Sequence, residues 1–491
     1  MGDDEPATIS EAAFPLGRAS FDPDAGPAEW LWRRVLEVLR AERERISARP
    51  VSAEVDLGRL RAAVGAYGFE EPVAPGVVID ETVALLREGT VHTTHPRYFG
   101  LFNPAPTLLG VVGETLAAAF NPQLAAWSHA PAAVEIEAHL VRFLGARMGY
   151  PAGAVAGSFT SGGAEANMTA VLLALTRTWP EYGTAGLRAL PGRPLLYASA
   201  ESHLAWLKIA HATGLGRDAV RLVPAGADLR MDVRRLRALL EADRAAGGAP
   251  FMVVGTAGTT GAGAIDPLPE LAALCGEFGV RFHVDAAYGG MAALSDRLRE
   301  DLAGIERAHS ITVDAHKWLS VPMGAGALLC TDREGLAETF RVSTSYMPAG
   351  IPDTVDPYTS SQQWSRRFAG LKLFLSLAVA GRSGYAEQLE RDAELAGLLR
   401  RRLADSGWLI VNDTPLPVVC FADPEAGARA PGEHHGALAR SVVRSGRAWI
   451  STVRLNGQDA LRACVISHRT TQADIDGLVQ AVNEARKEQR A

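Results

Sequence analysis

The chain has few cysteines, and their positions limit what it can be. Four cysteines stand far apart among 491 residues, at positions 275, 330, 420 and 464. No two have the short spacing of a zinc site, and four are too few for a disulfide framework in a chain of this length. We therefore expect no bound metal and no disulfides, as in a protein of the reducing cytoplasm.

Basic blocks and long apolar runs are missing as well. The formal net charge is −7 with no cluster of basic residues, which argues against nucleic acid as a partner. The most apolar long segment, residues 106–127, is interrupted by Glu114, Pro122 and Gln123. This pattern predicts a buried helix and no membrane span. The acidic N-terminus lacks the apolar region of a signal peptide, so we expect a cytoplasmic protein.

Lysine is rare. Of 49 basic residues only four are lysine, at positions 208, 317, 372 and 487, and the other 45 are arginine. Where only positive charge is needed, this sequence uses arginine. Lys317 nevertheless lies in a largely apolar stretch, VDAHKWLSVPMGAGALLC. An amine can lose its proton and attack a carbonyl, whereas a guanidinium cannot, so Lys317 is a candidate nucleophile.

The pattern of predicted helices and strands divides the sequence into three parts. Residues 1–95 have mainly helical periodicity, as in the helix expected at 28–46. Residues 96–372 alternate β-rich and helical segments, which predicts an α/β domain with a largely parallel sheet covered on both faces. Residues 373–491 predict a smaller α+β domain, with an exposed loop at 424–436 in which His434 and His435 face solvent.

Two polar residues at predicted strand ends suggest a cofactor. Asp285 ends the strand RFHVD, and Lys317 follows the strand SITVDA. In open parallel sheets, ligands bind at the carboxyl ends of the strands. A lysine that forms a Schiff base and a carboxylate that keeps a pyridine nitrogen protonated are what pyridoxal 5'-phosphate requires. Taken singly, Asp285 could be a turn residue and Lys317 a surface lysine.

A glycine-rich helix start could hold the phosphate of that cofactor. In FTSGGAEANMTAVLLAL, Gly162 and Gly163 open a long helical pattern, so free amides and the positive helix end are available for an anion. A plain loop-to-helix turn has the same sequence. No Gly-Lys-Ser/Thr follows, so the segment is not a nucleotide-binding P-loop.

These segments resemble a known family. TSGGAEAN, SHLAW, TAGTTGAGAIDP, FHVDAAYGG, DAHKWL and RRFAGLK occur in the order found in the pyridoxal-phosphate-dependent group II amino-acid decarboxylases, which act on aromatic amino acids, glutamate or histidine. The match is dense from about His95 to Leu373. The resemblance implies a fold-type I enzyme with a seven-stranded-type sheet, and a homodimer in which the N-terminal helices wrap the partner.

The resemblance also assigns the residues around the cofactor ring. Lys317 becomes the Schiff-base lysine, Asp285 the partner of the pyridine nitrogen, and His203 the residue that stacks on the ring face. Thr256 and Ala287 would lie against the cofactor. From the residues alone, His203 could equally be a core or capping histidine, and Thr256 could simply end its strand.

The phosphate contacts follow in the same way, with two departures. The resemblance implies that Gly163 and Ala164 donate amides to the phosphate and that His316 contacts it. Ala164 stands where many members have a phosphate-binding serine, and Asp314 stands where several have asparagine. The first departure removes a hydroxyl contact, and the second implies a different hydrogen-bond network around the phosphate.

The expected reaction is decarboxylation of an L-amino acid to its amine and CO₂. Tyr346, in the polar segment 338–364, matches the loop tyrosine that such enzymes use as proton donor, and aldehyde-forming relatives have phenylalanine there. Decarboxylation-dependent aldehyde synthesis and C–C lysis remain alternatives, as does a surface position for Tyr346. A non-enzymatic scaffold is disfavoured because the lysine, aspartate and tyrosine are all present.

The substrate is less constrained by the sequence. The segment 95–107 corresponds to the substrate side of the family's site, with Phe102 and Asn103 as the expected pocket contacts. Phe102 suits an aromatic or aliphatic side chain, whereas Asn103 and Arg97 could serve an acidic one. Arg366 could orient the substrate or the loop. For both arginines, a structural ion pair is the alternative.

Overall fold

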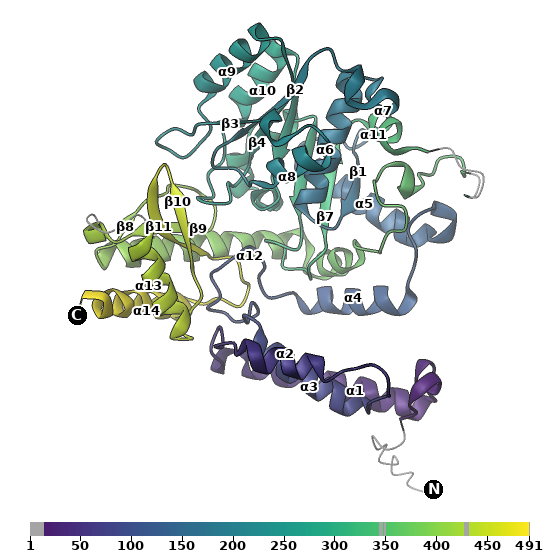
Figure 1. Cartoon of the computed structure of the whole chain (residues 1–491), viewed down its shortest axis with the longest axis vertical. Helices are drawn as coiled ribbons and strands as arrows, with labels where there is room; N and C mark the ends of the chain where they lie inside the picture. Colours follow the sequence, from purple (N-terminus) through teal and green to yellow (C-terminus); the bar gives the residue numbers. More distant parts are fainter. Residues whose placement is uncertain (1–13, 343–346, 348–349, 427–431, 491) are drawn as a thin grey trace, which may run out of the picture.

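The structure, a computed structural model, describes residues 14–342, 347, 350–426 and 432–490. Figure 1 shows a large sheet-containing body, a smaller layer of strands and helices beside it, and a group of N-terminal helices at one end. The boundaries at residues 95 and 372 stay predictions as limits of separately folding domains.

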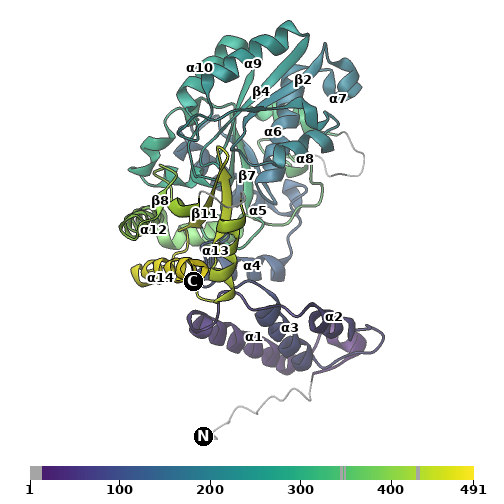
Figure 2. The same ribbon diagram turned by 60° about the vertical axis from the view of Figure 1, so that its left-hand side comes forward.

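The N-terminal helices are α1 (Ala25–Arg45), α2 (Leu57–Gly65) and α3 (Pro75–Gly89). The predicted helix at 28–46 is therefore confirmed. Asp56 caps α2 by accepting a hydrogen bond from the Arg59 amide, and Pro75 occupies the first position of α3, where its missing N–H has no cost. Both views show these helices side by side and set apart from the central sheet (Figures 1 and 2).

The central sheet has seven strands in the order β1-β7-β6-β5-β4-β2-β3. Every neighbouring pair is parallel except the two made by β7, which runs antiparallel to both β1 and β6. The prediction of an α/β fold with a mostly parallel seven-stranded sheet is confirmed. The strands are β1 (Ala156–Thr160), β2 (Arg193–Ser199), β3 (Val220–Val223), β4 (Gly248–Thr256), β5 (Arg281–Asp285), β6 (Ser310–Asp314) and β7 (Gly326–Cys330).

Both faces of this sheet are buried. Val253 and Val254 are consecutive in β4, yet they belong to two different hydrophobic clusters, because successive side chains of a strand point to opposite faces. A strand buried on both faces needs a continuous apolar run, which the FMVV of β4 supplies. One cluster draws on α5 (Pro131–Arg147), α9 (Val233–Ala245) and α10 (Leu268–Phe278), and the other on α6 (Gly163–Thr178), α8 (Ala205–Ala212) and α11 (Arg333–Phe340).

Two further helices complete this region. Helix α4 (Leu108–Phe120) begins at Thr107, whose hydroxyl accepts a hydrogen bond from the Gly110 amide. It packs against the start of the long helix α12 (Leu371–Asp405). The contact is close, since a Cβ at Gly113 would lie 2.6 Å from the Cα of Lys372. The short helix α7 (Tyr182–Ala185) follows α6.

The C-terminal part has its own sheet and core. Helix α12, interrupted at Gly381 (φ 67°), leads into an antiparallel sheet of order β10-β11-β9-β8. Its strands are β8 (Leu409–Ile410), β9 (Val418–Ala422), β10 (Ser451–Leu455) and β11 (Gln458–Cys464), and α13 (Glu433–Arg444) and α14 (Gln472–Arg490) cover it. The predicted α+β organisation of this part is thus observed.

One local prediction in this part is wrong. His434 and His435 are buried in the first turn of α13, where they were expected to face solvent in a loop. His434 Nε2 lies 3.0 Å from Asp423 Oδ2, and His435 Nε2 accepts a hydrogen bond from the Asp423 amide at 3.0 Å. The glycines and proline around them suggested a loop, but α13 begins at Glu433, before both histidines.

No described helix combines the length and the apolar character that crossing a membrane requires. Within the same described residues, no group of three or more His, Cys, Asp and Glu side chains is arranged to hold a metal ion.

Candidate active site

The ends of three parallel strands bring the predicted cofactor residues together. Asp285, the last residue of β5, is paired in register with Thr256 at the end of β4 and with Thr312 near the end of β6. Its carboxylate is buried. One oxygen accepts a hydrogen bond from the Ala287 amide at 3.2 Å, and the other from the Asn167 side-chain amide at 2.8 Å.

Lys317 lies in the turn that follows β6. Its Nζ is 3.1 Å from Asp314 Oδ2, and the Lys317 side chain is 25% exposed while that of Asp314 is 2% exposed. The turn is closed by the Lys317 amide, which donates to the Asp314 carbonyl at 3.2 Å. An ammonium group therefore sits at the open side of the strand ends, held from behind by a buried carboxylate.

The start of α6 lies against the same carboxylate. A Cβ at Gly163 would come within 2.9 Å of Asp314 Oδ2 and 3.2 Å of the Ala287 side chain, so only glycine fits there. The other oxygen, Asp314 Oδ1, is buried without a hydrogen-bond partner among the described residues, and a Cβ at Gly326 would lie 2.6 Å from it. As the first residues of a helix, Gly163 and Ala164 have amides with no partner inside the helix.

His316 lies beside the start of α6, and we call Gly163, Ala164 and His316 the cradle. Its Nδ1 accepts a hydrogen bond from the Ala325 amide at 3.2 Å, which leaves the proton of a neutral ring on Nε2. Burial lowers the pKa of His316, so the ring is neutral at pH 7. A Cβ at Gly162 would lie 3.4 Å from the His316 ring, which places the ring beside the helix start. His316 thus offers one N–H donor next to the free amides of α6.

His203 follows β2 and has the same tautomer. Its Nδ1 accepts from the Ala205 amide at 3.1 Å, so Nε2 carries the proton of the neutral ring. The residue is exposed on one side, but the atoms packed around its ring remove water from it and so lower its pKa. The negative charge of Asp285 raises the pKa of His203, and the positive charge of Lys317 lowers it further. The charges of Asp285 and Lys317 both act on the His203 ring.

Phe102, a predicted substrate residue, packs in a row of tilted aromatic rings. The ring centroid of Phe102 is 4.1 Å from that of Tyr288, which is 5.4 Å from that of Trp318, the residue after Lys317. The Arg462 guanidinium lies 5.5 Å from the Phe102 ring. Asn103 accepts a hydrogen bond from the Tyr98 hydroxyl at 2.9 Å. This row of rings connects the segment at 95–107 to the turn that carries Lys317.

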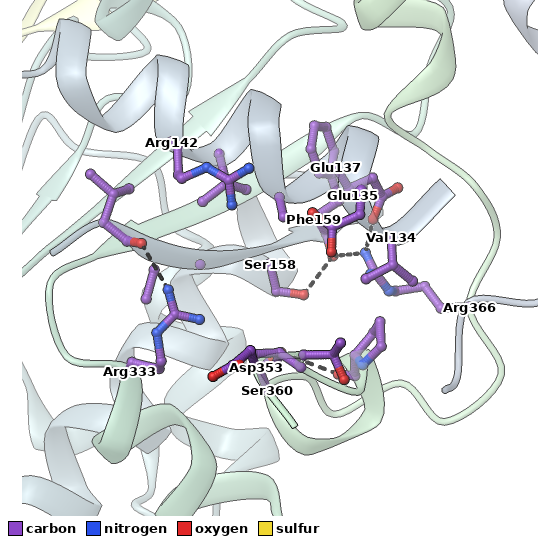
Figure 3. A pocket seen from close by; sticks show the side chains of 18 residues that line it. Val134, Glu135, Glu137, Arg142, Ser158, Phe159, Arg333, Asp353, Ser360 and Arg366 are labelled. Atoms are coloured by element: carbon purple, nitrogen blue, oxygen red, sulfur yellow. Dashed lines mark hydrogen bonds and ion pairs between the residues drawn. The ribbon is translucent and has the colours of Figure 1, made fainter. Parts of the chain in front are cut away.

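Two arginines considered for the substrate have acidic partners elsewhere. Arg366 NH1 is 2.7 Å from Glu137 Oε2, both side chains are buried, and the same nitrogen donates to the Phe159 carbonyl at 3.3 Å. This pair forms a wall of a cavity of about 420 Å³ between α5, the edge of β1 and residues 353–360 (Figure 3). None of the predicted cofactor residues lines this cavity. Arg97 pairs with Asp474 at 3.1 Å.

Comparison with known proteins identifies the family. Residues 71–423 match the model of the pyridoxal-dependent decarboxylase conserved domain. The chain belongs to the pyridoxal-dependent decarboxylase family. It is 30% identical to an aromatic-L-amino-acid decarboxylase of Bacillus atrophaeus, over 88% of this chain and 89% of that protein. It is 32% identical to an L-2,4-diaminobutyrate decarboxylase of Rhizobium meliloti (strain 1021), over 80% of this chain and 78% of that protein.

The fold agrees with that assignment. The structure of mouse CSAD in apo form matches with a TM-score of 0.87 and 27% identity, over 94% of this chain and 99% of that one. This pyridoxal-dependent decarboxylase therefore has the fold-type I architecture, binds pyridoxal 5'-phosphate and converts an amino acid to its amine, as a lyase. The group II family resemblance seen in the sequence is confirmed.

The described residues fit this cofactor chemically. A pyridine nitrogen requires a buried acid, which Asp285 supplies, and an aldehyde requires a reachable amine, which Lys317 supplies. A phosphate requires N–H donors and space, and glycine at 163 leaves that space open beside the helix start. One feature works against an anion, because the Asp314 carboxylate lies behind the same glycine. Its ion pair with Lys317 offsets this charge.

Three residues near the site were missed by sequence reasoning. Asn167 and His283 form a buried hydrogen-bonded chain behind Asp285. Arg462 is a buried arginine that donates to the carbonyls of Thr260 and Gly100 and has no acidic partner within the described residues. A histidine between two apolar residues of a strand, as in RFHVD, was the available signal. Tyr346 lies outside the described residues.

Proposed function

We propose that Lys317 is the lysine to which the cofactor's aldehyde is attached and that Asp285 faces its ring nitrogen. The observation that carries this proposal is that β5 and β6 are neighbouring strands. Asp285 at the end of β5 pairs with Thr312 of β6, and β6 ends at Asp314, after which the turn with Lys317 begins. When bound, pyridoxal 5'-phosphate takes up the electron pair that the broken Cα bond leaves behind. A carboxylate near the nitrogen favours its protonated form.

We propose that the cradle at the start of α6 holds the phosphate. The amides of Gly163 and Ala164 and the Nε2–H of His316 are the donors, and the helix end adds a favourable field. Asp314 positions Lys317 through their ion pair and does not contact the phosphate. Thr256 and Ala287 lie beside Asp285 and border the ring.

The remaining assignments concern proton transfer and substrate. We assign to His203 a place on the ring face, supported by its electrostatic coupling to both Asp285 and Lys317. We assign to Tyr346 delivery of the proton to Cα after CO₂ leaves, because a phenol is neutral at pH 7 and suited to a site from which water is excluded. We assign the substrate side chain to Phe102 and Asn103. For Arg366, the ion pair with Glu137 favours the structural alternative over substrate binding.

We further propose that two copies of the chain form a homodimer through the N-terminal helices and α4. Trp32, Leu36 and Leu39 form an exposed stripe along α1. A second exposed stripe runs along α4 from Leu108 to Phe120, which is 82% exposed. Apolar stripes on this scale mark protein–protein contacts. Sedimentation of the wild type should give a dimer, and an active monomer at assay concentration would contradict this proposal.

We keep the prediction of a cytoplasmic location. It is supported by the four cysteines, which are all buried free thiols. Export of the native protein with its activity into an oxidising compartment would count against it.

Decarboxylation of a specific substrate is tested by measuring CO₂ and amine from the twenty amino acids and common derivatives. The holoenzyme should release CO₂ and amine in equal amounts from one chemical class. Lys317→Arg, which keeps the positive charge, is the matched control and should release neither. Peroxide formed in step with CO₂ would instead favour the aldehyde-forming alternative.

A further inference from the structure

A chain of hydrogen bonds extends from Asp285 into the core. Asn167 Nδ2 donates to Asp285 Oδ2 at 2.8 Å, and Asn167 Oδ1 lies 3.1 Å from His283 Nε2. His283 Nδ1 lies 2.8 Å from the Ser310 hydroxyl. The chain links α6, β5 and β6, and its two central members, Asn167 and His283, are only 2% and 1% exposed.

The direction of each hydrogen bond is fixed by its neighbour. A carboxylate only accepts, so Asn167 must turn its NH₂ group toward Asp285 and its oxygen toward His283. That oxygen also only accepts, so His283 must carry a proton on Nε2. In a neutral ring, Nδ1 is then the acceptor and the Ser310 hydroxyl is the donor. With a carboxylate at Asp285, every contact in this chain has one donor and one acceptor.

His283 is held neutral by its surroundings. It packs edge-on against Trp206, with ring centroids 5.8 Å apart, and the Thr312 hydroxyl lies 3.4 Å from Nε2. Burial lowers its pKa to about 4, and Asp285 is the charged group that opposes this shift. The chain therefore brings hydrogen-bond donors to Asp285 without bringing a positive charge. A cationic donor would compete with a protonated ring nitrogen for the same carboxylate.

We propose that Asn167 and His283 are positioning residues that keep Asp285 ionised and turned toward the ring nitrogen of the cofactor, and so keep that nitrogen protonated. This inference rests on the proposed role of Asp285. Neither residue touches the reacting atoms. Removing Asn167 leaves one carboxylate oxygen buried without its donor, which favours the neutral acid. A neutral Asp285 would no longer stabilise the protonated nitrogen.

The test uses the protein loaded with pyridoxal 5'-phosphate labelled with ¹⁵N in the ring. The ¹⁵N chemical shift reports protonation of that nitrogen directly, without turnover. In the wild type we expect the protonated signal from pH 6 to pH 9. In Asn167→Leu, the signal should move to the unprotonated position at a pH at least one unit lower than in the wild type, which is a tenfold change in the proton affinity of the nitrogen.

His283 provides a matched pair of variants. Gln at position 283 places an amide N–H at about the reach of imidazole Nε2, so His283→Gln can still donate to Asn167. Asn at position 283 reaches only as far as Nδ1, so His283→Asn keeps the Ser310 contact and loses Asn167. We expect His283→Gln to give the wild-type ¹⁵N profile and His283→Asn to shift it as Asn167→Leu does. Circular dichroism checks that each variant is folded.

The outcomes separate this inference from the proposed function. If the wild type cannot be fixed to its cofactor at Lys317 by borohydride, or if Asp285→Asn leaves the nitrogen protonated, the role proposed for Asp285 is wrong. If Asp285→Asn deprotonates the nitrogen while Asn167→Leu and His283→Asn both keep the wild-type profile, the positioning role is wrong. If Asn167→Leu does not fold, the two His283 variants decide alone, and equal profiles for them overturn the proposal.

Discussion

The indole N–H of Trp318 donates a hydrogen bond to Asp392 Oδ2 across 2.9 Å, and both side chains are buried. Trp318 follows Lys317 directly, whereas Asp392 lies in the middle of α12. Gln388 donates to the other oxygen of Asp392 at 2.8 Å. The turn that carries Lys317 is thus tied to α12 through a carboxylate with two neutral donors and no cation within salt-bridge distance in the described part of the chain.

Asp392→Asn should change how stability depends on pH. Burial raises the pKa of Asp392 to about 7, whereas an unfolded aspartate titrates near 4, so the native protein retains a proton that the unfolded chain loses. Wild-type stability contributed by this group is therefore complete below about pH 4 and lost as the pH rises to about 7. The free energy of unfolding of Asp392→Asn, relative to wild type, should rise by roughly 4 kcal/mol across that range. Urea unfolding at pH 4, 5.5 and 7 measures it, and a constant difference would contradict the shift.

Lys317→Arg should abolish catalysis without loss of folding. The guanidinium keeps the ion pair with Asp314 but cannot attack an aldehyde at neutral pH. We expect no borohydride-stable attachment of the cofactor and no CO₂ release, with a thermal unfolding midpoint close to the wild type. Lys208→Arg, on α8, is the matched control and should remain fully active. An active Lys317→Arg would mean that another amine holds the cofactor.

Asp285→Asn should bind the cofactor but lose most of its rate. The amide oxygen can still accept the hydrogen bond from Asn167, while its NH₂ group takes the place of the oxygen that accepted from the Ala287 amide. The negative charge opposite the ring nitrogen is gone, and losing such an electrostatic contribution typically costs about 10²–10³-fold in kcat. Steady-state kinetics with KM and kcat measured separately would show it. A decrease of less than tenfold would assign protonation of the ring to a different residue.

Glu137→Gln should destabilise the fold strongly. It removes the carboxylate that pairs with buried Arg366, and an isolated buried charge costs about 3–5 kcal/mol. Arg142→Gln, an exposed arginine lining the same cavity, should change the free energy of unfolding by no more than about 0.5 kcal/mol. The two are compared by denaturant unfolding. If Glu137→Gln instead raises KM and leaves stability intact, the pair serves the substrate.

Tyr346→Phe separates two reactions that share every other proposed residue. The substitution keeps the ring and removes the phenolic proton, so after CO₂ loss Cα lacks its proton donor. Amine formation should fall sharply while aldehyde, ammonia and peroxide accumulate in the presence of oxygen. The products are measured with and without oxygen. Amine at the wild-type rate would move the donor role to another group, with His203 as the next candidate.

The sequence was sufficient to predict the largely parallel sheet, and the positions of two residues at its edge, for a physical reason. The carboxyl ends of parallel strands meet at one edge, so Asp285 and Lys317, each at or after the end of a predicted strand, were expected to lie close together, while their roles came from the resemblance to the family. Asn167 could not be placed in this way, because it lies 118 residues from Asp285 and its direction depends on how α6 packs across β5. The ion pair between Arg366 and Glu137 depends on how α5 packs beside β1, and no local sequence pattern predicts that packing. His434 and His435 were misplaced because glycine and proline mark where a loop lies but not where it ends.

The position of β7 between β1 and β6 has a consequence for how the chain folds as it is made. Strand β1 lies at the edge of the sheet and its neighbour there is β7, with Ala156 opposite Cys330. During synthesis β1 therefore emerges about 170 residues before the strand that must hold it, whereas β6 and β7 pair as a local hairpin. Until residue 330 has appeared, β1 and the apolar face of its covering helix α5 have no sheet to join, and a chain halted before that point would expose that face to aggregation.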